Sequence, residues 1–330
     1  MTFLYIIIVL VLIFDFINGF HDSANSIATV VSTKVLSPFS AVLLAAIFNF
    51  IAFTVFPLKV AATMGKGVVE PDVINLNVIG AALIAAISWN LVTWWWGLPS
   101  SSSHTLVGGL VGAAIASSGM DSVITGGVIK IVAFILIAPL LGMVIGFFIS
   151  ITVQYFARKH TPFGIDKHFR RLQLLSAAAF SLGHGGNDAQ KSMGIIWVAL
   201  IVTGLATKND KIAWWIVLSC QAAIALGTLF GGWRIVKTMG QKITKLKPFE
   251  GFCAETAGAL TLFGATHFGI PVSTTHTITG SIIGVGARKG LSAVKWGVTT
   301  KIFWAWILTM PISGVIGAIM YMFFNLIHLS

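Results

Sequence analysis

Long apolar stretches alternate with short polar breaks along the whole chain. The apolar segments lie at about 3–33, 40–57, 75–97, 104–119, 125–156, 172–206, 212–232, 251–268, 274–287 and 296–327. An α-helix needs about 20 mostly apolar residues to cross the hydrocarbon core of a bilayer, which is about 30 Å thick. The pattern therefore predicts an all-α polytopic membrane protein, with the lipid bilayer as its surroundings.

The composition supports a membrane protein over a soluble one. Hydrophobic residues make up 56% of the chain and charged residues only 9%, whereas charged residues are about a quarter of an ordinary soluble domain. The residues before Lys34 include no lysine or arginine, so we expect them to remain as a first membrane helix and not to be cleaved as a signal peptide. Cys220 and Cys253 lie in or beside apolar runs, and neither a disulfide framework nor a metal site is predicted from them.

The basic residues are grouped in the breaks between apolar segments. The net charge is +11, and the densest basic stretches are residues 158–171 and 234–247. Because cytoplasmic loops carry an excess of lysine and arginine, residues 158–171 are predicted to be a cytoplasmic linker of a multi-pass protein of the inner cell membrane. This grouping indicates membrane topology, and we predict no nucleic-acid partner.

The two halves of the chain resemble each other. GLPSSSSHTLVGGLVG at 97–112 matches GIPVSTTHTITGSIIG at 269–284, and GFHDSANS at 19–26 matches GGNDAQKS at 185–192. Five apolar segments in each half give the halves opposite directions in the membrane. The predicted organisation is a first membrane repeat at 1–157, the basic linker at 158–171 and an inverted second repeat at 172–330.

Two buried carboxylates are predicted in the first repeated motif. As straight helices, segments 3–33 and 172–206 would be roughly 45–50 Å long, so we expect each to be broken near its motif, and the two breaks to meet at a central binding site. Ionisable groups inside a membrane are functional candidates by default. Glu255 is a further candidate for ion coupling because the other half has no acid at the matching position. The predicted ion-coupling residues are Asp22, Asn25, Asn187, Asp188, Gln190, His21 and Glu255.

Hydroxyl groups are concentrated in the second repeated motif. A lone serine in a membrane helix usually bonds to its own backbone, but three hydroxyl residues after a proline, twice, predict an oxyanion site at a helix start. Lys191 either neutralises Asp188 or attracts the anion. His104 and His276 either link helices or take part in gating or proton transfer. The predicted substrate-binding residues are Ser101, Ser102, Ser103, Ser273, Thr274, Thr275 and Lys191.

NGFHDSAN and SLGHGGNDAQKSMG, together with PSSSSHT and PVSTTHT, resemble the inorganic phosphate transporter (PiT) family. The resemblance implies a homodimeric secondary transporter that binds phosphate and coupling ions between its halves, without a cofactor. The His-Asp pair of the first motif and the Gln-Lys tail of the second are similar to the bacterial low-affinity branch. That branch implies proton coupling and transport of metal–phosphate complexes. His21 differs from the asparagine typical of sodium-coupled members.

Two other functions fit parts of this pattern. A serine hydrolase inside the membrane needs one nucleophile and one base, whereas these motifs occur twice in antiparallel copies, so we predict that the protein is not an enzyme. A permease for another oxyanion, such as sulfate, is the closer rival. Phosphate can donate a hydrogen bond to a carboxylate near neutral pH and sulfate cannot. The prediction is a proton-coupled importer of inorganic phosphate, with sodium coupling as the alternative.

Overall fold

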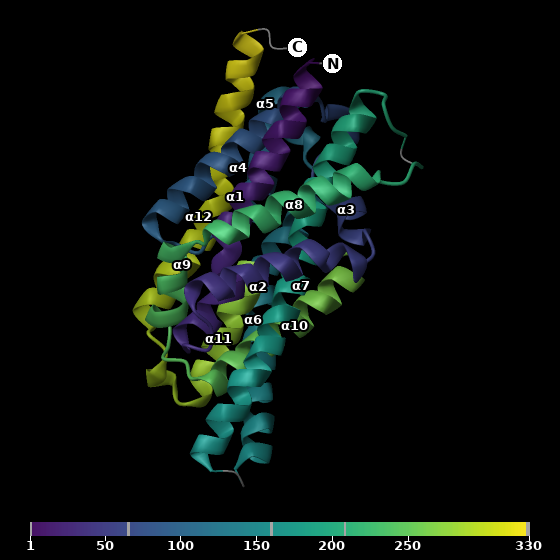
Figure 1. Cartoon of the computed structure of the whole chain (residues 1–330). Helices are drawn as coiled ribbons and strands as arrows, with labels where there is room; N and C mark the ends of the chain where they lie inside the picture. Colours follow the sequence, from purple (N-terminus) through teal and green to yellow (C-terminus); the bar gives the residue numbers. More distant parts are fainter. Residues whose placement is uncertain (1, 65–66, 159–160, 208, 328–330) are drawn as a thin grey trace.

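A computed structural model of the chain describes residues 2–64, 67–158, 161–207 and 209–327, and its regular elements are helices (Figure 1). This confirms the predicted all-α class. The α-helices of the described residues are α1 Thr2–Ser32, α2 Pro38–Ile51, α3 Lys59–Met64, α4 Leu76–Trp96, α5 Ser102–Ser118, α6 Thr125–Ala157, α7 Pro162–Val202, α8 Trp214–Phe230, α9 Trp233–Lys237, α10 Pro248–His267, α11 Thr274–Arg288 and α12 Trp296–Leu326. Short 3-10 turns lie at Ala52–Thr54, Pro71–Val73, Met120–Ser122 and Leu291–Ala293, and a π-helical turn, Thr238–Lys242, continues α9.

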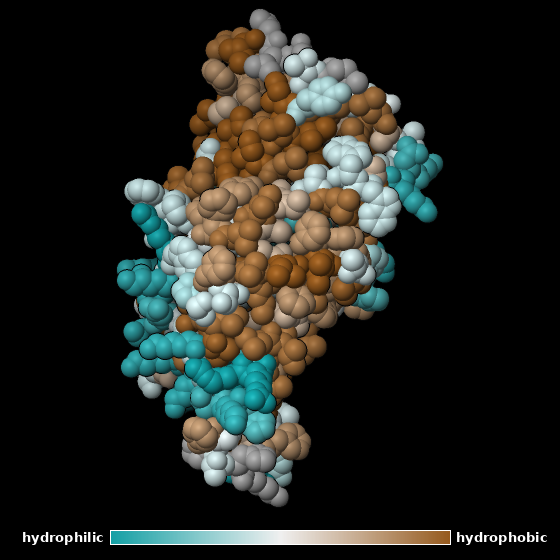
Figure 2. Space-filling model, in the orientation of Figure 1, coloured by the Kyte–Doolittle hydropathy of each residue, from teal (hydrophilic) through white to brown (hydrophobic). Residues whose placement is uncertain are grey.

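The outer surface is apolar over most of the length of the bundle. Figure 2 shows this surface over the upper and middle parts of the molecule, with most hydrophilic side chains gathered in the lower part and along the left edge and a smaller group at the right edge. Within the described residues, α1, α4, α6 and α12 are each long and apolar enough to cross a membrane. Helix α8 and the α9 segment that follows it could form a further span bent by 62°. The chain is therefore an integral membrane protein.

The breaks predicted inside segments 3–33 and 172–206 are not found, because α1 and α7 run through both motifs as continuous helices. The motif glycines serve helix packing instead. A Cβ on Gly19 would lie 2.1 Å from the carbonyl oxygen of Ile224 in α8, and one on Gly185 would lie 2.4 Å from that of Asn49 in α2. Glycine lets the helix backbones approach closely here. The expectation of broken helices at these motifs was wrong for this reason.

Helix α7 starts inside the stretch predicted to be a linker. The Thr161 hydroxyl caps the helix by accepting from the Gly164 amide, and Pro162 follows at the first helical position. Most of the basic stretch 158–171 is therefore the first part of α7. The Arg170 side chain donates to the carbonyl oxygen of Lys34, so these two basic positions lie together. That they face the cytoplasm stays a prediction.

Two helical hairpins form the centre of the bundle. Helices α4 and α5 are antiparallel, because Thr105 near the start of α5 donates to Asn90 near the end of α4, and residues 97–101 join them. Helices α10 and α11 form the matching hairpin, joined by residues 268–273. Gly97 and Gly269, the first and the second residue of these two turns, have φ of 67° and 70°. This left-handed conformation strongly favours glycine, which explains why both repeats carry one at this position.

Each hairpin packs against the last long helix of the other half. Helix α5 lies along α12, and α11 lies along α6. A Cβ on Gly112 of α5 would lie 1.9 Å from the carbonyl oxygen of Gly314, and one on Gly284 of α11 would lie 2.0 Å from that of Met143. The first two helices of each half also pack against the other half: α1 lies against α8, and α7 lies against α2. This is the contact pattern that two repeats related by a two-fold axis produce, and it supports the inverted repeat, which stays a prediction.

Candidate substrate and ion site

The starts of α5 and α11 present hydroxyl groups to the interior. The Ser101 hydroxyl accepts a hydrogen bond from the His104 amide at 3.4 Å, and the Ser273 hydroxyl accepts from the His276 amide at 3.2 Å. These two predicted substrate residues are therefore helix N-caps. They set the direction of the hydroxyl residues that follow them.

The two repeated motifs meet, as the sequence predicted for a central site. Ser102 of α5 donates to Asp22 of α1 at 3.3 Å, and Thr275 of α11 donates to the same carboxylate at 3.4 Å. Thr274 donates to Asp188 of α7 at 3.0 Å. The Asn25 amide donates to Thr275 at 3.0 Å and to Thr274 at 3.3 Å. All of these side chains are buried. The two hairpins, α1 and α7 therefore build one polar site.

Lys191 pairs with a carboxylate of the site. Its ammonium group donates to Asp188 at 2.5 Å, to the Ser103 hydroxyl at 2.5 Å and to the carbonyl oxygen of Val272 at 2.8 Å. Of the two roles considered for Lys191, neutralising Asp188 is the one seen in this structure. The contact with Ser103 also places the positive charge among the predicted substrate hydroxyls.

His21 lies directly beside Asp22. Its Nδ1 is 2.6 Å from the Asp22 carboxylate, and its Nε2 is 3.2 Å from the hydroxyl of Thr93 and 3.3 Å from that of Ser100. The ring therefore joins α1 to the end of α4 and the turn after it. His21 contacts Asp22 and Lys191 contacts Asp188, so each of the two carboxylates has a basic side chain beside it.

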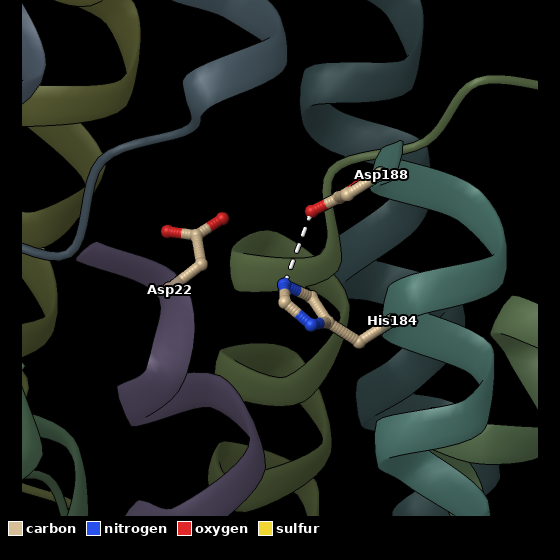
Figure 3. A group of neighbouring side chains, drawn as sticks. All are labelled: Asp22, His184 and Asp188. Carbon is tan, nitrogen blue, oxygen red and sulfur yellow. Dashed lines mark ion pairs between the residues drawn. The ribbon is translucent and has the colours of Figure 1, made fainter. Parts of the chain in front are cut away.

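His184 belongs to the site although the sequence analysis did not include it. Its Nε2 lies 3.3 Å from Asp188, and Figure 3 shows the ring directed into the space between Asp22 and Asp188. One ligand atom from each of these three residues lies within 4.8 Å of the others, so this group could hold a metal ion. His184 is four residues before Asp188 and shares its helix face. That spacing was the signal that could have identified it.

Two predicted ion-coupling residues support neighbouring segments. The Asn187 amide donates to Thr266 near the end of α10 and to the carbonyl oxygen of Ile270 in the turn between α10 and α11. The Gln190 amide donates to the carbonyl oxygen of Pro57, and its oxygen accepts from the Val60 amide. These contacts hold the ends of α10 and α3 close to α7. The structure does not bring either amide into contact with Asp22 or Asp188.

Glu255 forms a separate buried cluster between α1, α7 and α10. Its carboxyl accepts from Thr29 at 2.5 Å, from Ser176 at 2.5 Å and from the Gln173 amide at 3.1 Å. Thr29 is two helical turns beyond Asp22 on α1, which is about 10 Å along the axis. The cluster is therefore distinct from the central site but shares two of its helices.

His104 and His276 face each other where the two hairpins meet. Their ring centroids are 4.9 Å apart, and the ring of His276 also stacks on Trp306 of α12 at 3.9 Å. Trp306 in turn donates to the carbonyl oxygen of Pro99 in the first hairpin turn. Matching positions of the two repeats thus meet in one stack. A linking role is visible, and a gating or proton role stays a prediction.

Comparison with known proteins gives consistent matches over nearly the whole chain. The model of a family described as the phosphate transporter family matches residues 18–317. A probable low-affinity inorganic phosphate transporter of Rhizobium meliloti (strain 1021) is 56% identical over 315 residues, covering 96% of this chain and 94% of the relative. A protein of the same description from Bacillus subtilis (strain 168) is 46% identical over 324 residues, covering 98% and 97%. A solved structure, "The sodium-dependent phosphate transporter", is similar with a TM-score of 0.88 and 28% identity, covering 99% of this chain and 100% of that one.

Proposed function

This chain belongs to the phosphate transporter family, and we propose that it imports inorganic phosphate together with protons across the inner cell membrane. Its relatives are transporters, so the protein is a phosphate transporter and not an enzyme. The identity of the coupling ion is the proposed part. The relatives named low-affinity transporters fit the proton-coupled branch, while the sodium-dependent structural neighbour supports the alternative.

The charge of the buried site is the observation that carries symport. Among the residues that the structure describes, the site holds two carboxylates, Asp22 and Asp188, and one ammonium group, that of Lys191. A phosphate dianion entering this site adds negative charge to a region already short of positive charge. Buried charge without compensation is costly. Phosphate therefore needs cations to enter with it, and a cation bound beforehand raises its affinity.

The donors around the site suit a tetrahedral anion. Hydroxyl groups of Ser102, Ser103, Thr274 and Thr275 lie at the starts of two helices, where backbone N–H groups and the helix dipole favour negative charge. The carboxylate of Asp22 can accept a hydrogen bond from a protonated phosphate oxygen. Sulfate has no such proton to donate, so this contact favours phosphate over the sulfate rival.

Removing one hydroxyl from either hairpin should weaken phosphate binding. Ser102→Ala and Thr274→Ala each delete one donor, which corresponds to about 1–2 kcal/mol, or roughly a 5–30-fold higher Kd. Binding to purified protein measures the effect, and Ser118→Ala, an exposed serine at the end of α5, is the matched control. Arsenate, which is tetrahedral and similarly protonated, should compete. If sulfate competes as strongly as arsenate, the phosphate contacts proposed here are wrong.

Glu255 provides support for protons as the coupling ion. The ion pairs of the described residues include no lysine, arginine or histidine partner for it. Its neighbours, Thr29 and Ser176, carry hydroxyl groups, which donate to a carboxylate and can turn to accept from a protonated carboxyl. The cluster can therefore hold Glu255 in either state. A proton bound there changes the contacts among α1, α7 and α10.

Uptake is expected to run on a proton gradient without sodium. In proteoliposomes with choline replacing sodium, an inward proton gradient should drive accumulation of labelled phosphate, and a protonophore should abolish it. Glu255→Gln should lower this driven uptake about tenfold, or about 1.4 kcal/mol in the barrier, because glutamine carries no proton. Exchange of phosphate across the membrane at equal concentrations should continue, since it needs no net proton movement.

Glu70→Gln offers a control for this experiment, because it removes an exposed carboxylate. Uptake that requires sodium and ignores the protonophore would assign the coupling to sodium. His21 would then be a brace between α1 and α4, and the neutral oxygens near Asp22 and Asp188 would be candidate sodium ligands.

Three further features belong to the same proposal. A homodimer and the movement of phosphate as a metal complex are implied by the resemblance to the low-affinity branch. The cytoplasmic position of the basic stretch is supported by the positive-inside rule and by the contact between Arg170 and Lys34, which gathers basic segments at one end of the bundle.

A further inference from the structure

Asp15 of α1 carries a buried carboxyl group that the proposed function does not use. Its side chain is fully buried, and neither of its oxygens makes a hydrogen bond within the described residues. The other buried carboxyl groups in the described part of the chain, those of Asp22, Asp188, Glu250 and Glu255, all accept hydrogen bonds. Burying a carboxylate charge without a donor is costly. Asp15 therefore needs a proton or another cation at this position.

The polar neighbours of Asp15 also have unused hydrogen-bonding atoms. The Ser192 hydroxyl of α7 and the Cys220 thiol of α8 lie beside it without hydrogen-bond geometry. Asn18 follows one turn later in α1, and its side-chain oxygen is buried without a partner, as is the Ser192 oxygen. A protonated carboxyl both donates and accepts hydrogen bonds. With one proton bound, Asp15 can donate to the Asn18 oxygen and accept from Ser192, so a single proton satisfies the cluster.

A proton fits this cluster better than a metal ion does. Hard cations are held by several oxygen ligands, about six for Mg²⁺, whereas one of the groups beside Asp15 is the thiol of Cys220. The surroundings are otherwise apolar. Ile196 and Ile224, which lie one turn beyond Ser192 and Cys220 on their helices, both belong to a buried hydrophobic cluster. The cluster therefore offers too few oxygen ligands for a metal ion.

The charged groups near Asp15 leave no basic partner for it. Helices α2 and α4, which also pack on α1, carry no titratable side chain, and the basic residues of α9 are exposed. Helices α11 and α10 bond to α1 at Asn25 and Thr29, more than two turns beyond Asp15. The titratable groups close to Asp15 are the Cys220 thiol and the ion pair of Asp188 with Lys191. Because Lys191 is already paired, a proton is the cation that remains for Asp15.

Asp15 is the first of three levels of buried carboxyl groups along α1. Asp22 follows seven residues later, and Thr29, which donates to Glu255, follows after seven more. Seven residues are two helical turns, so these positions share one face of α1 and lie about 10 Å apart along its axis. The N-terminal half of α1 lies at the upper end in Figure 1, whereas most hydrophilic side chains lie in the lower part of Figure 2. Asp15 therefore lies on the side of the central site that faces away from the basic end.

We propose that Asp15 binds a proton in each transport cycle, as the outermost of these three levels, with Asn18 and Ser192 as the partners of its protonated form. The proposal deepens the proposed function and rests on it for proton coupling. Asp15 gains an O–H bond by taking a proton from water on the outer side, and it loses that proton to water when the transporter opens to the inner side. The proton crosses with phosphate, and no other bond forms or breaks.

Counting protons per phosphate tests this inference. Liposomes that hold the full-length protein and enclose a pH-sensitive dye report the entry of protons, and labelled phosphate reports uptake in the same sample. Asp15→Asn keeps the shape of the protonated side chain but can neither bind nor release a proton. We expect it to lower proton-driven accumulation about tenfold and to carry about one proton fewer per phosphate. Exchange at equal phosphate concentrations should continue.

Two control variants and one spectroscopic reading accompany the proton count. Asp15→Glu keeps an ionisable carboxyl and should keep the wild-type number of protons per phosphate. Asp72→Asn removes an exposed carboxylate between α3 and α4 and should change neither reading. Infrared difference spectra after a pH step need no transport. The C=O band of a protonated buried carboxyl should appear in the wild type and be shifted in Asp15→Glu.

Three results would overturn the inference. A wild-type proton count in Asp15→Asn would show that the group is permanently neutral. Loss of both exchange and driven uptake in both Asp15 variants would show a structural role. The same infrared spectrum in the wild type and Asp15→Glu would show that no proton moves at this position, and this comparison decides if Asp15→Asn alone fails to fold. The proposed function fails separately, when the wild type itself ignores the proton gradient.

Discussion

Asp22→Asn and Asp188→Asn are each expected to lower phosphate uptake roughly a hundredfold, or about 2.7 kcal/mol, while the protein still inserts and folds. Asparagine has the shape of aspartate and keeps one acceptor oxygen, so the hydroxyl contacts of α5 and α11 can survive. It has no negative charge, however, and therefore cannot attract the cation that must enter with phosphate. Labelled phosphate uptake at matched expression measures the loss.

Asp121→Asn is the control for these substitutions, because Asp121 is an exposed carboxylate in the turn between α5 and α6. Near-normal uptake by either mutant would remove that carboxylate from the transport site. Asp22 accepts from both hairpins, through Ser102 and Thr275, whereas Asp188 accepts from Thr274 of the second hairpin, so the two mutants can also differ from each other. A loss in one alone would show that the two halves have unequal roles.

Replacing Lys191 is expected to have the largest effect on stability. Lys191 and Asp188 are both buried, with exposed side-chain fractions of 2% and 1%. Lys191→Met removes the charge and fills a similar volume, but it leaves the Asp188 carboxylate without its ammonium partner in a region sheltered from water. Breaking a buried ion pair from one side costs about 3–5 kcal/mol. Unfolding of the purified protein by heat or denaturant in detergent measures this loss.

The double variant Lys191→Met, Asp188→Asn separates pairing from transport. Because it removes both charges, it should recover most of the lost stability, and the coupling energy follows from the four proteins of the cycle. Phosphate uptake should remain absent in the double variant. If the single lysine variant is as stable as the wild type, the ion pair contributes little to stability. The role of Lys191 is then to bind the anion.

The helices were largely predictable because their signal is local. All ten apolar segments are helical, and α4 and α12 begin and end within one residue of the predicted bounds. The start of α7 was missed because its first ten residues, PFGIDKHFRR, are too polar and charged to continue the apolar pattern, although the Thr161-Pro162 pair is a typical helix start. The predicted breaks failed for a different reason. Gly19 and Gly185 contact neighbouring backbones, and which helix lies against a glycine cannot be read from its own segment.

The central site was predictable where the repeat doubled the signal. Asp22 with Asp188, and the hydroxyls at the starts of α5 and α11, were identified because matching motifs occur twice. Gln190 was identified from its place in the motif, yet its amide bonds to the backbone before α3, a contact that depends on tertiary packing. His184 stands opposite Asn18 in the repeat, so pairing identical residues between the halves overlooked it.

Each hairpin packs against a helix of the other half, and this also constrains the order in which the chain can assemble during synthesis. The first hairpin ends at Ser118, but α12, against which its glycine face packs, begins only at Trp296. Ribosomes add roughly 5–20 residues per second, so about 180 residues of further synthesis leave that face without its partner for about 10–40 seconds. During this interval the Gly108 and Gly112 surface is bordered by lipid or by the insertion machinery. Assembly of the transport site must therefore wait for the last helix to leave the ribosome.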